Sequence, residues 1–282
     1  MEKQTMSIEK IILNALQEDV GDCDHSSLLS ILPNIIGSSQ LIVKENGIIA
    51  GVEVAEKVFS IVDENLKMEI RIHDGEKIKK GDIVFIVSGK VQSILTAERL
   101  VLNIMQRMSG IATKTAYYNS LIAGTGARLL DTRKTTPNFR ILEKMAVKIG
   151  GGCNHRMGLY DMIMLKDNHI DFAGGLKNAL EKTNYYLKEK GLNLKIEIET
   201  RSIEEVKEAL RLGGFFRIMF DNFTPEKVKE AVALVNKRYE TEASGNITEE
   251  TILAYAKTGV DFISVGALTN KAKSLDLSLK AI

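Results

Sequence analysis

After Gly124, short apolar runs alternate with segments that have the spacing of amphipathic helices. Seven of these runs read as candidate strands: ARLLD, MAVKIG, DMIML, LKIEIE, FRIMF, the run entering TEASG, and DFISVG. Strands that alternate with helices form parallel sheets, because a crossover helix brings each strand back in the same direction. The pattern therefore predicts an α/β barrel of seven strands, with an open doubly wound sheet as the alternative.

Two of the intervening helices carry clear start signals. Ser202 with Glu205 predicts a capping box, and Thr224 followed by Pro225 predicts an N-cap and a first helical residue.

Before Gly124 the order of predicted helices and strands is different. Helical spacing predicts helices over Ser7–Gln17, VEVAEKVFSIV and Val91–Met108, whereas SSQLIVKE, LKMEIRI and GDIVFIVSG read as strands. These elements predict a separate, compact α+β unit.

Charge and composition narrow the class of ligand. The net charge of +1 over 282 residues gives no global attraction to nucleic acid or to an anionic membrane. Tryptophan is absent and aromatic residues make up 6%, which argues against a surface for stacked bases. Residues 127–170 are different, because they hold eight Lys or Arg against four Asp or Glu. A local excess of cations in a balanced chain favours a small anionic ligand.

The cysteines and the N-terminus bear on the compartment. Cys23 and Cys153 lie far apart with no CxxC, so neither a disulfide framework nor a structural zinc is expected. The N-terminal MEKQTMSIEK has no signal-peptide pattern, and no apolar run approaches the length of a membrane span. A cytoplasmic protein is therefore predicted.

Polar side chains follow the candidate strands at the point where each strand ends. In chain order they are Asp131-Thr-Arg133-Lys134, His155-Arg156, Lys166-Asp-Asn-His169, Glu197 with Glu199, Asp221-Asn222, Ser244-Gly245 and Gly266-Ala267. The carboxyl ends of parallel barrel strands emerge at one face, where barrel active sites are built. The sequence therefore predicts that these groups share one site.

The chemistry of the set is that of anion recognition. Arginine binds carboxylate or phosphate through two parallel hydrogen bonds, and lysine supplies a point charge. Glu199 and Asp221 offer oxygen ligands for Mg²⁺ or acceptors for ribose hydroxyls. The turns at Ser244-Gly245 and Gly266 expose main-chain N–H groups of the kind that bind phosphate. Together they predict a site for a phosphorylated sugar, a divalent metal and a carboxylated substrate.

A family resemblance follows from the same segments. In order, DTRKTTPNFR, GGGCNHRMGLYDMIMLKDNHI, EIET, IMFDNF, EASGNI and SVGALT resemble quinolinate phosphoribosyltransferases, the decarboxylating nicotinate-nucleotide pyrophosphorylases. The upstream LTAERLVLNIMQRMSGIAT resembles the same family, so the likeness runs from about residue 90 to the C-terminus. The chain departs from the family pattern at Asn270-Lys271, where a His-Ser pair is usual.

The resemblance implies a fold and a reaction. The fold is an N-terminal α+β sandwich followed by an incomplete seven-stranded α/β barrel, like other type II phosphoribosyltransferases. We place the sandwich domain at 1–108 and the barrel with the active site at 109–269, and expect the tail 270–282 to return to the first domain. The reaction joins quinolinate to phosphoribosyl pyrophosphate (PRPP) with Mg²⁺. Its products are nicotinate mononucleotide, pyrophosphate and CO₂, a step of de novo NAD biosynthesis.

The resemblance also assigns roles residue by residue. Arg133, His155 and Arg156 would face the quinolinate carboxylates, and Arg99 would reach in from the partner subunit of a homodimer. Lys134 and Lys166 would meet pyrophosphate or carboxylate charge. The remaining groups would serve the phosphosugar: Glu199 and Asp221 the ribose and Mg²⁺, and Ser244, Gly245 and Gly266 the 5′-phosphate. Lys134, Lys166, Glu199 and Asp221 are the predicted catalytic residues.

Several alternatives stay open from the sequence. Glu197 alternates with Glu199 along one strand, so either could be the functional acid. The substrate could be another carboxylated ring, such as nicotinate. Lys166 could instead form the Schiff base of an aldolase on a similar barrel, which requires a desolvated lysine. An inactive phosphosugar-binding protein is the third possibility, and the full set of acids and bases argues against it.

Overall fold

The structure, a computed structural model of the chain, describes residues 7–282. Residues 1–6, which belong to the N-terminal stretch considered for a signal peptide and to the predicted domain 1–108, lie outside the described residues. The chain divides into two compact units. Unit 1 comprises Met1–Ala116, Thr135–Gly151 and Leu268–Ile282, and unit 2 comprises Tyr117–Lys134 and Gly152–Ala267.

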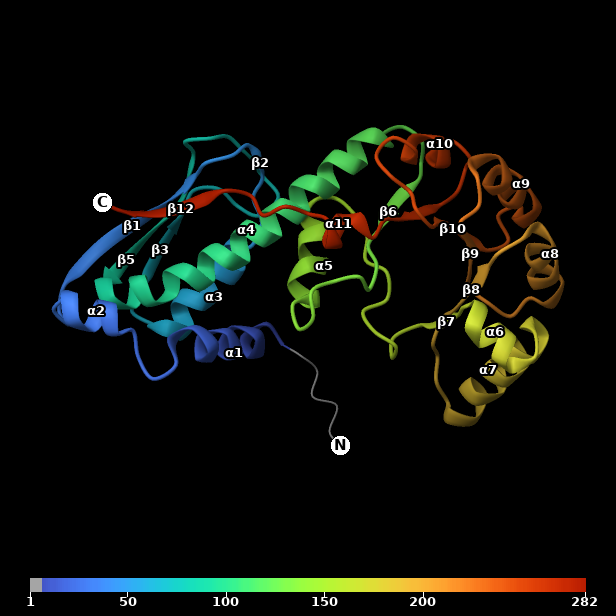
Figure 1. The fold of residues 1–282 in the computed structure, drawn as a ribbon, viewed down its shortest axis with the longest axis horizontal. Coiled ribbons are helices and arrows are strands. Elements are labelled where there is room, and N and C mark those ends of the chain that lie inside the picture. Colours follow the sequence, from blue (N-terminus) through green and yellow to red (C-terminus); the bar gives the residue numbers. More distant parts are fainter. Residues whose placement is uncertain (1–6) are drawn as a thin grey trace. The chain divides into compact units, whose positions relative to one another are not determined.

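Unit 1 is built on an antiparallel sheet whose strand order is β12-β1-β5-β3 (Figure 1). The strands are β1 (Ile36–Val43), β3 (Lys67–Ile70), β5 (Ile83–Lys90) and β12 (Leu277–Ala281). Strand β12 pairs with β1, so that Ser39 lies opposite Ala281 and Val43 opposite Leu277. The C-terminal segment thereby completes the sheet formed by the N-terminal residues. A two-stranded ladder joins β2 (Gly47–Ile48) to β4 (Lys77–Ile78).

Six helices belong wholly or mostly to unit 1. They are α1 (Ile8–Val20), α2 (His25–Ser30), α3 (Val52–Val62), α5 (Arg140–Ile149) and most of α4 (Val91–Leu121) and α11 (Ala267–Asn270). Helix α3 has the predicted bounds, and Asp74 caps it by accepting from the N–H groups of Val52 and Glu53 at 2.9 and 3.3 Å. Phe59 on α3 packs edge-on against Phe85 on β5, with ring centres 5.9 Å apart.

Helix α4 continues well past the predicted end at Met108. Ser109 and Gly110 read as a stop in the sequence, but both serve packing. The buried Ser109 hydroxyl accepts from Ala50 N–H at 3.0 Å and donates to Ala50 O at 3.2 Å. At Gly110, any Cβ would collide with the main-chain carbonyl of Lys273. The glycine is there because the C-terminal segment crosses the helix at this point.

Unit 2 is a parallel sheet with the strand order β6-β11-β10-β9-β8-β7. Its strands are β6 (Arg128–Leu130), β7 (Ile163–Leu165), β8 (Ile196–Thr200), β9 (Arg217–Asp221), β10 (Glu240–Ser244) and β11 (Phe262–Ser264). Figure 1 shows the helices outside the strands: α6 (Asp167–Ala173), α7 (Leu176–Lys190), α8 (Ile203–Leu212), α9 (Pro225–Val235) and α10 (Ile252–Ala256). The predicted α/β class is confirmed.

The predicted helix starts are also present. The hydroxyl of Ser202 accepts from Glu205 N–H at 3.2 Å, and that of Thr224 accepts from Lys227 N–H at 3.4 Å. Pro225 occupies the first helical position of α9. The Glu205 carboxylate reaches back one residue further than a capping box requires, to the N–H of Arg201 at 2.6 Å. Local sequence therefore determined where these helices begin.

One predicted strand was wrong. The run MAVKIG belongs to helix α5, in which Leu142, Ala146 and Val147 are buried at helical spacing. The seventh strand position is reduced to a single parallel bridge between Leu130 and Cys153. Among the described residues β6 and β7 do not pair, so the barrel is incomplete, as predicted. Within residues 7–282, no helix has both the length and the apolar character needed to cross a bilayer.

Candidate active site

The predicted site residues of unit 2 lie at the carboxyl ends of its strands. Lys166 directly follows β7, and Glu199 is the fourth residue of β8. Asp221 and Ser244 end β9 and β10 and pair with one another in the parallel register. Gly266 lies two residues beyond β11. The arrangement matches the edge of the sheet at which α/β barrels carry out chemistry.

A buried aspartate joins the two cationic segments. Asp131 has no exposed surface and follows β6 directly. Its carboxylate accepts from the N–H of His155 at 2.9 Å and from Asn154 Nδ2 at 2.6 Å. This clamp fixes the NHR segment to the start of the DTRK segment. The exposed Arg133, two residues after the clamp, and the buried Arg156 are therefore held on a common support.

The charges of Arg133 and Arg156 act on each other. Burial lowers the pKa of the Arg156 guanidinium, and the charge of Arg133 lowers it further, while Glu197 and Asp161 oppose the shift. Arg156 is 9% exposed, and its Nη1 donates to Met162 O at 3.1 Å. Two neighbouring guanidinium groups are stabilised by an anion that contacts both. The pair is well suited to a substrate carboxylate.

Lys166 forms an ion pair with Glu199. The Lys166 Nζ lies 2.7 Å from Glu199 Oε2. Lys166 is the residue before helix α6, and His169 holds it there by accepting from its N–H through Nδ1 at 3.1 Å. His169 thus serves the local structure. A Schiff-base lysine must be desolvated to react, whereas the Lys166 side chain is 44% exposed and lies beside a carboxylate.

The turn after β10 leaves no room for a side chain. Gly245 has φ +96°, and a Cβ there would lie 2.6 Å from Asn222 Cγ and 2.7 Å from Asn222 N. Asn222 donates through its N–H to Ser244 O at 2.9 Å and through Nδ2 to Asp221 Oδ2 at 2.7 Å. The ends of β9 and β10 are therefore locked together around a glycine, which leaves main-chain groups accessible to a ligand.

The acids at these strand ends fit a magnesium ion that is shared with a substrate. Glu199 and Asp221 supply carboxylate oxygens, the donors that Mg²⁺ prefers. Among the described residues, neither belongs to a group of three metal donors within 4.8 Å. A protein site with one or two carboxylates is typical of Mg²⁺ that keeps water and phosphate oxygens as its other ligands.

Further down the strands lies a cluster of buried charges. Glu197 and Glu242 have no exposed surface, and Arg217 and His155 are each 8% exposed. Arg217 Nη1 lies 3.0 Å from Glu242 Oε2, and His155 Nε2 lies 3.0 Å from Glu197 Oε2. Burial raises the pKa of Glu197 to about 7. Burial and the charge of Glu197 raise the pKa of Glu242 to about 8.

Sequence reasoning missed Arg217 and Glu242 and left Glu197 as an alternative to Glu199. The structure buries both Glu197 and Glu199 but separates their partners, since Glu199 pairs with Lys166 and Glu197 with His155. Arg217 and Glu242 could have been identified from the two-residue period of a strand, in which every second side chain points to the same face. Glu242 precedes Ser244 by two residues, and Arg217 precedes Asp221 by four, so both share the inward face.

Cavities lie at both ends of this sheet. One of about 200 Å³ is bordered by Glu199, Thr200 and Arg201 at the carboxyl end of β8. A larger one, about 680 Å³, lies at the amino ends of β9 to β11 and is lined by residues such as Phe216 and Tyr239. The larger cavity is far along the strands from the predicted site residues, and no predicted residue borders it.

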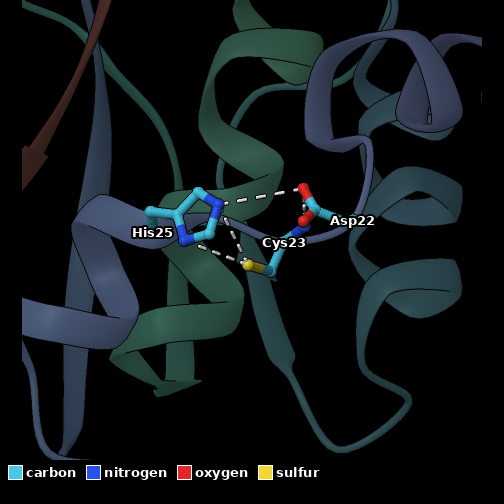
Figure 2. Close-up of side chains that lie close together, drawn as sticks. All are labelled: Asp22, Cys23 and His25. Carbon is cyan, nitrogen blue, oxygen red and sulfur yellow. Dashed lines mark hydrogen bonds and ion pairs between the residues drawn. The ribbon is translucent and has the colours of Figure 1, made fainter.

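A further group of donors lies in unit 1, in the loop after α1 and at the first residue of α2. Figure 2 shows Asp22, Cys23 and His25 close together, with Cys23 Sγ 3.4 Å from His25 Nδ1 and His25 Nε2 3.8 Å from Asp22 Oδ1. The side chains of His25 and Asp22 are 72% and 88% exposed. Nothing buried holds them in place, so we assign the cluster no role. Both cysteines of the chain are free thiols.

Arg99 belongs to unit 1 and is exposed on helix α4. Leu95 precedes it by one helical turn and is 39% exposed. Nearby, Gln92 Nε2 donates to Ile31 O at 2.7 Å, which ties the start of α4 to the end of α2.

Comparison with known proteins gives the family. Residues 24–109 match the N-terminal domain of quinolinate phosphoribosyl transferase, and residues 111–280 match its C-terminal domain. A quinolinate phosphoribosyltransferase [decarboxylating] 1b from Nicotiana tabacum is 46% identical over 98% of this chain and 83% of its own. A probable nicotinate-nucleotide pyrophosphorylase [carboxylating] from Bacillus subtilis is 39% identical over 97% of this chain and 93% of its own.

Solved structures agree. NadC from Streptococcus pyogenes superposes with a TM-score of 0.91 at 38% identity, covering 98% of this chain and 97% of that one. The nicotinate-nucleotide pyrophosphorylase from Francisella tularensis gives 0.90 at 38% identity, covering 98% and 96%. The two domain models together span nearly the whole chain, and the site described above lies within them. The chain therefore belongs to the quinolinate phosphoribosyltransferase family.

Proposed function

We propose that this chain is a decarboxylating quinolinate phosphoribosyltransferase of NAD biosynthesis. It joins quinolinate to PRPP and releases nicotinate mononucleotide, pyrophosphate and CO₂. The observation that carries the proposal is the pair Arg133 and Arg156, two guanidinium groups that act on each other at the ends of neighbouring strand segments. Relatives with this printed activity share 44–46% of the sequence, which supports the same substrates here.

Quinolinate has two adjacent carboxylates, and the site offers several cations for them. Arg133 and Arg156 bind one or both through paired hydrogen bonds. Lys134, which follows Arg133, adds charge at the exposed side of the same segment. His155 lies beside Arg156 and supports the same part of the site. Three cations for one small ring favour a dicarboxylate over a monocarboxylate such as nicotinate.

The phosphosugar is held by the next three strand ends. Glu199 and Asp221 accept from the ribose hydroxyls and would be the residues that hold Mg²⁺. When bound, that ion neutralises charge on the leaving pyrophosphate. The turns at Ser244-Gly245 and Gly266 bind the 5′-phosphate through main-chain N–H groups. The closeness of Gly245 to Asn222 supports this role, because only a glycine leaves the turn this compact.

The side chains of this site promote the reaction by orienting the substrates and by stabilising the charges that develop. The pyridine nitrogen attacks C1 of the ribose as the C1–O bond to pyrophosphate breaks. Positive charge develops on the sugar, and Glu199 and Asp221 stabilise it. Lys166 stabilises the negative charge of pyrophosphate or of a carboxylate. Once the nitrogen is glycosylated, the bond to the 2-carboxylate breaks, CO₂ leaves, and a proton replaces it on the ring carbon. No covalent nucleophile is needed.

A homodimer and a cytoplasmic location complete the proposal. Unit 1 exposes apolar side chains around α2 and the start of β1: Leu28, Leu29, Leu32, Ile35 and Ile36, at 46–88% exposure. Leu95 extends this surface along α4 toward Arg99. An exposed apolar patch of this kind is typical of a protein interface. It supports a second copy of the chain as the partner and Arg99 as the residue that reaches the partner's site.

The test is a direct assay with two substrates. Purified protein is mixed with PRPP, Mg²⁺ and either quinolinate or nicotinate, and nicotinate mononucleotide is followed by mass spectrometry. We expect product from quinolinate only, with one CO₂ released from a labelled 2-carboxylate for each molecule formed. Product from nicotinate alone would show that the pocket binds a monocarboxylate instead. No product from either, in a folded dimer, would contradict the proposal.

A further inference from the structure

The two ring nitrogens of His155 face different groups of the same chain. Nδ1 accepts a hydrogen bond of 2.7 Å from the main-chain N–H of Arg156. Nε2 lies 3.0 Å from Glu197 Oε2 and 3.5 Å from Glu242 Oε2. A ring nitrogen that accepts a hydrogen bond carries no proton. The proton of the neutral imidazole is therefore on Nε2, where it faces the two carboxyl groups.

The same geometry argues against a metal ion among these groups. His155, Glu197 and Glu242 offer three donor atoms within 4.8 Å, a spacing that a metal could bridge. However, Nε2 cannot bind a metal while it carries the proton, and Nδ1 is occupied by Arg156 N–H. Arg217 already brings positive charge to Glu242 at 3.0 Å. The cluster is thus held by the ion pair of Arg217 with Glu242 and by the hydrogen bond from Arg156 N–H to His155 Nδ1.

Glu242 is the centre of this cluster and is fixed from two sides. Its Oε2 lies 3.0 Å from Arg217 Nη1 and 3.5 Å from His155 Nε2. Arg217 is in turn fixed by Glu240, whose Oε2 lies 2.7 Å from Nη2, and by the ring of Phe262, 4.3 Å from its guanidinium carbon. A side chain held this way has little freedom to change rotamer. It presents a fixed carboxyl group to the imidazole, 3.5 Å from Nε2.

We propose that Glu242, acting through His155, positions Arg156 for the substrate carboxylate. The inference rests on the proposed function, in which Arg156 binds quinolinate. Arg156 is anchored at its main-chain N–H by His155 and at Nη1 by Met162 O. If the imidazole turned, the first anchor would be lost and the guanidinium would shift relative to Arg133. Glu242 touches no substrate in this scheme, so it is a positioning residue.

Steady-state kinetics test the proposal. We expect Glu242→Leu to raise KM for quinolinate about tenfold or more, because small misplacements of a binding group are costly. KM for PRPP should stay unchanged, since Asp221, Ser244 and Gly245 are not part of this chain of contacts. Glu242→Gln, which keeps an acceptor for Nε2–H, should recover part of the loss. A purely structural role would instead change both KM values together with thermal stability.

Glu240 provides the matched control. It is two residues earlier on β10 and binds the same Arg217 through hydrogen bonds of 3.1 and 2.7 Å. Because Glu242 and the ring of Phe262 still hold Arg217 in Glu240→Leu, this variant should raise KM for quinolinate far less than Glu242→Leu does. Wild-type KM in Glu242→Leu, or the same rise in both variants, would overturn the proposal. An inactive wild-type enzyme would instead overturn the proposed function.

A second measurement needs no change to Glu242. The chain has four histidines, so ¹⁵N-labelled histidine gives a small set of imidazole signals, and His155→Gln identifies those of His155. We expect a protonated Nε2 and an unprotonated Nδ1 in the wild-type protein at neutral pH. A proton on Nδ1 would break the predicted link to Arg156 and refute the positioning scheme, whatever the enzyme turns over.

Discussion

Lys166 Nζ lies 2.7 Å from Glu199 Oε2, which joins the end of strand β7 to strand β8 beside it. The lysine side chain is 44% exposed and that of the glutamate 8%. Partly exposed ion pairs of this kind stabilise a fold by about 1 kcal/mol or less. The pair therefore matters mainly for where it holds its charges, at the edge where an anionic substrate would bind.

Replacing Lys166 should separate activity from stability. We expect Lys166→Ala to lower kcat about a hundredfold or more, because a charge aimed at the transition state is lost. The free energy of unfolding in urea should fall by about 1 kcal/mol or less. Lys177→Ala, which removes an exposed lysine paired with Glu181 on α7, should change neither quantity. An active Lys166→Ala enzyme would exclude the proposed role of this lysine.

Replacing Arg133 is expected to weaken the binding of quinolinate without affecting that of PRPP. Removing one charge-assisted contact of this kind commonly costs about 2–5 kcal/mol, so Arg133→Ala should raise KM for quinolinate about 30-fold or more. KM for PRPP and the circular dichroism spectrum should stay near wild type. Arg211→Ala, at an exposed position on α8, is the control. Full activity of Arg133→Ala would contradict the assignment of Arg133 to quinolinate binding.

The sequence predicted the parts of this fold that depend on local periodicity. Helix α3, the caps at Ser202 and Thr224, and the strand ends that carry Lys166 and Asp221 are as expected, because each follows from spacing or from a short-range signal. Where the prediction was wrong, long-range packing decided. MAVKIG is apolar enough for a strand, but its buried residues Ala146 and Val147 continue the helical spacing that begins at Leu142 on helix α5.

The buried charges were missed for a related reason. Glu242 and Arg217 look like ordinary polar residues in the sequence, and only the pairing of β8, β9 and β10 brings them together with Glu197. Their strands could be predicted one by one, but the parallel register that aligns Glu197 with Arg217 could not. Gly110 is similar, since the segment that crosses it lies more than 160 residues later in the chain.

Gly110 gives a stability prediction with an unusual sign. Glycine to alanine inside a helix usually stabilises by about 0.5–1 kcal/mol. Here the new Cβ would collide with Lys273 O and lie 3.2 Å from Ser274 Cα, so we expect Gly110→Ala to destabilise by about 1–3 kcal/mol. Asn103→Ala, exposed on the same helix, should be neutral or slightly stabilising. Urea denaturation measures both, and a stabilised Gly110→Ala would contradict the packing.

A side chain at position 245 should strain the backbone and weaken the binding of PRPP. Gly245→Ala places a Cβ against Asn222 at φ +96° and should raise KM for PRPP while leaving KM for quinolinate unchanged. Gly259→Ala is a matched control, because its φ is +86° but the nearest atom, Val232 Cγ1, is 3.7 Å away. Both variants should lose about 1 kcal/mol of stability from the strained backbone. Equal PRPP affinity in the two would argue against a phosphate turn at Gly245.

The raised pKa of Glu242 predicts how stability varies with pH. Burial and the charge of Glu197 raise this pKa from 4.5 to about 8, while His155 and Arg217 oppose the shift. Between these two values the folded state binds more protons than the unfolded state, so the free energy of unfolding falls as pH rises. Below about pH 4.5 the contribution is fully present, and it is lost as pH passes 8.

Replacing Glu242 by glutamine should therefore flatten this dependence, because an amide does not titrate. Urea denaturation of wild type and Glu242→Gln at about pH 5, 6.5 and 8 compares the two slopes, since all other titrating groups are shared. We expect the free energy of unfolding of Glu242→Gln to increase relative to that of the wild type as pH rises, whatever their difference at pH 5. Glu240→Gln, which alters the other partner of Arg217, should keep the wild-type slope. Parallel curves for wild type and Glu242→Gln would show that the buried carboxyl keeps an ordinary pKa, and that its ion pair with Arg217 offsets the cost of burial.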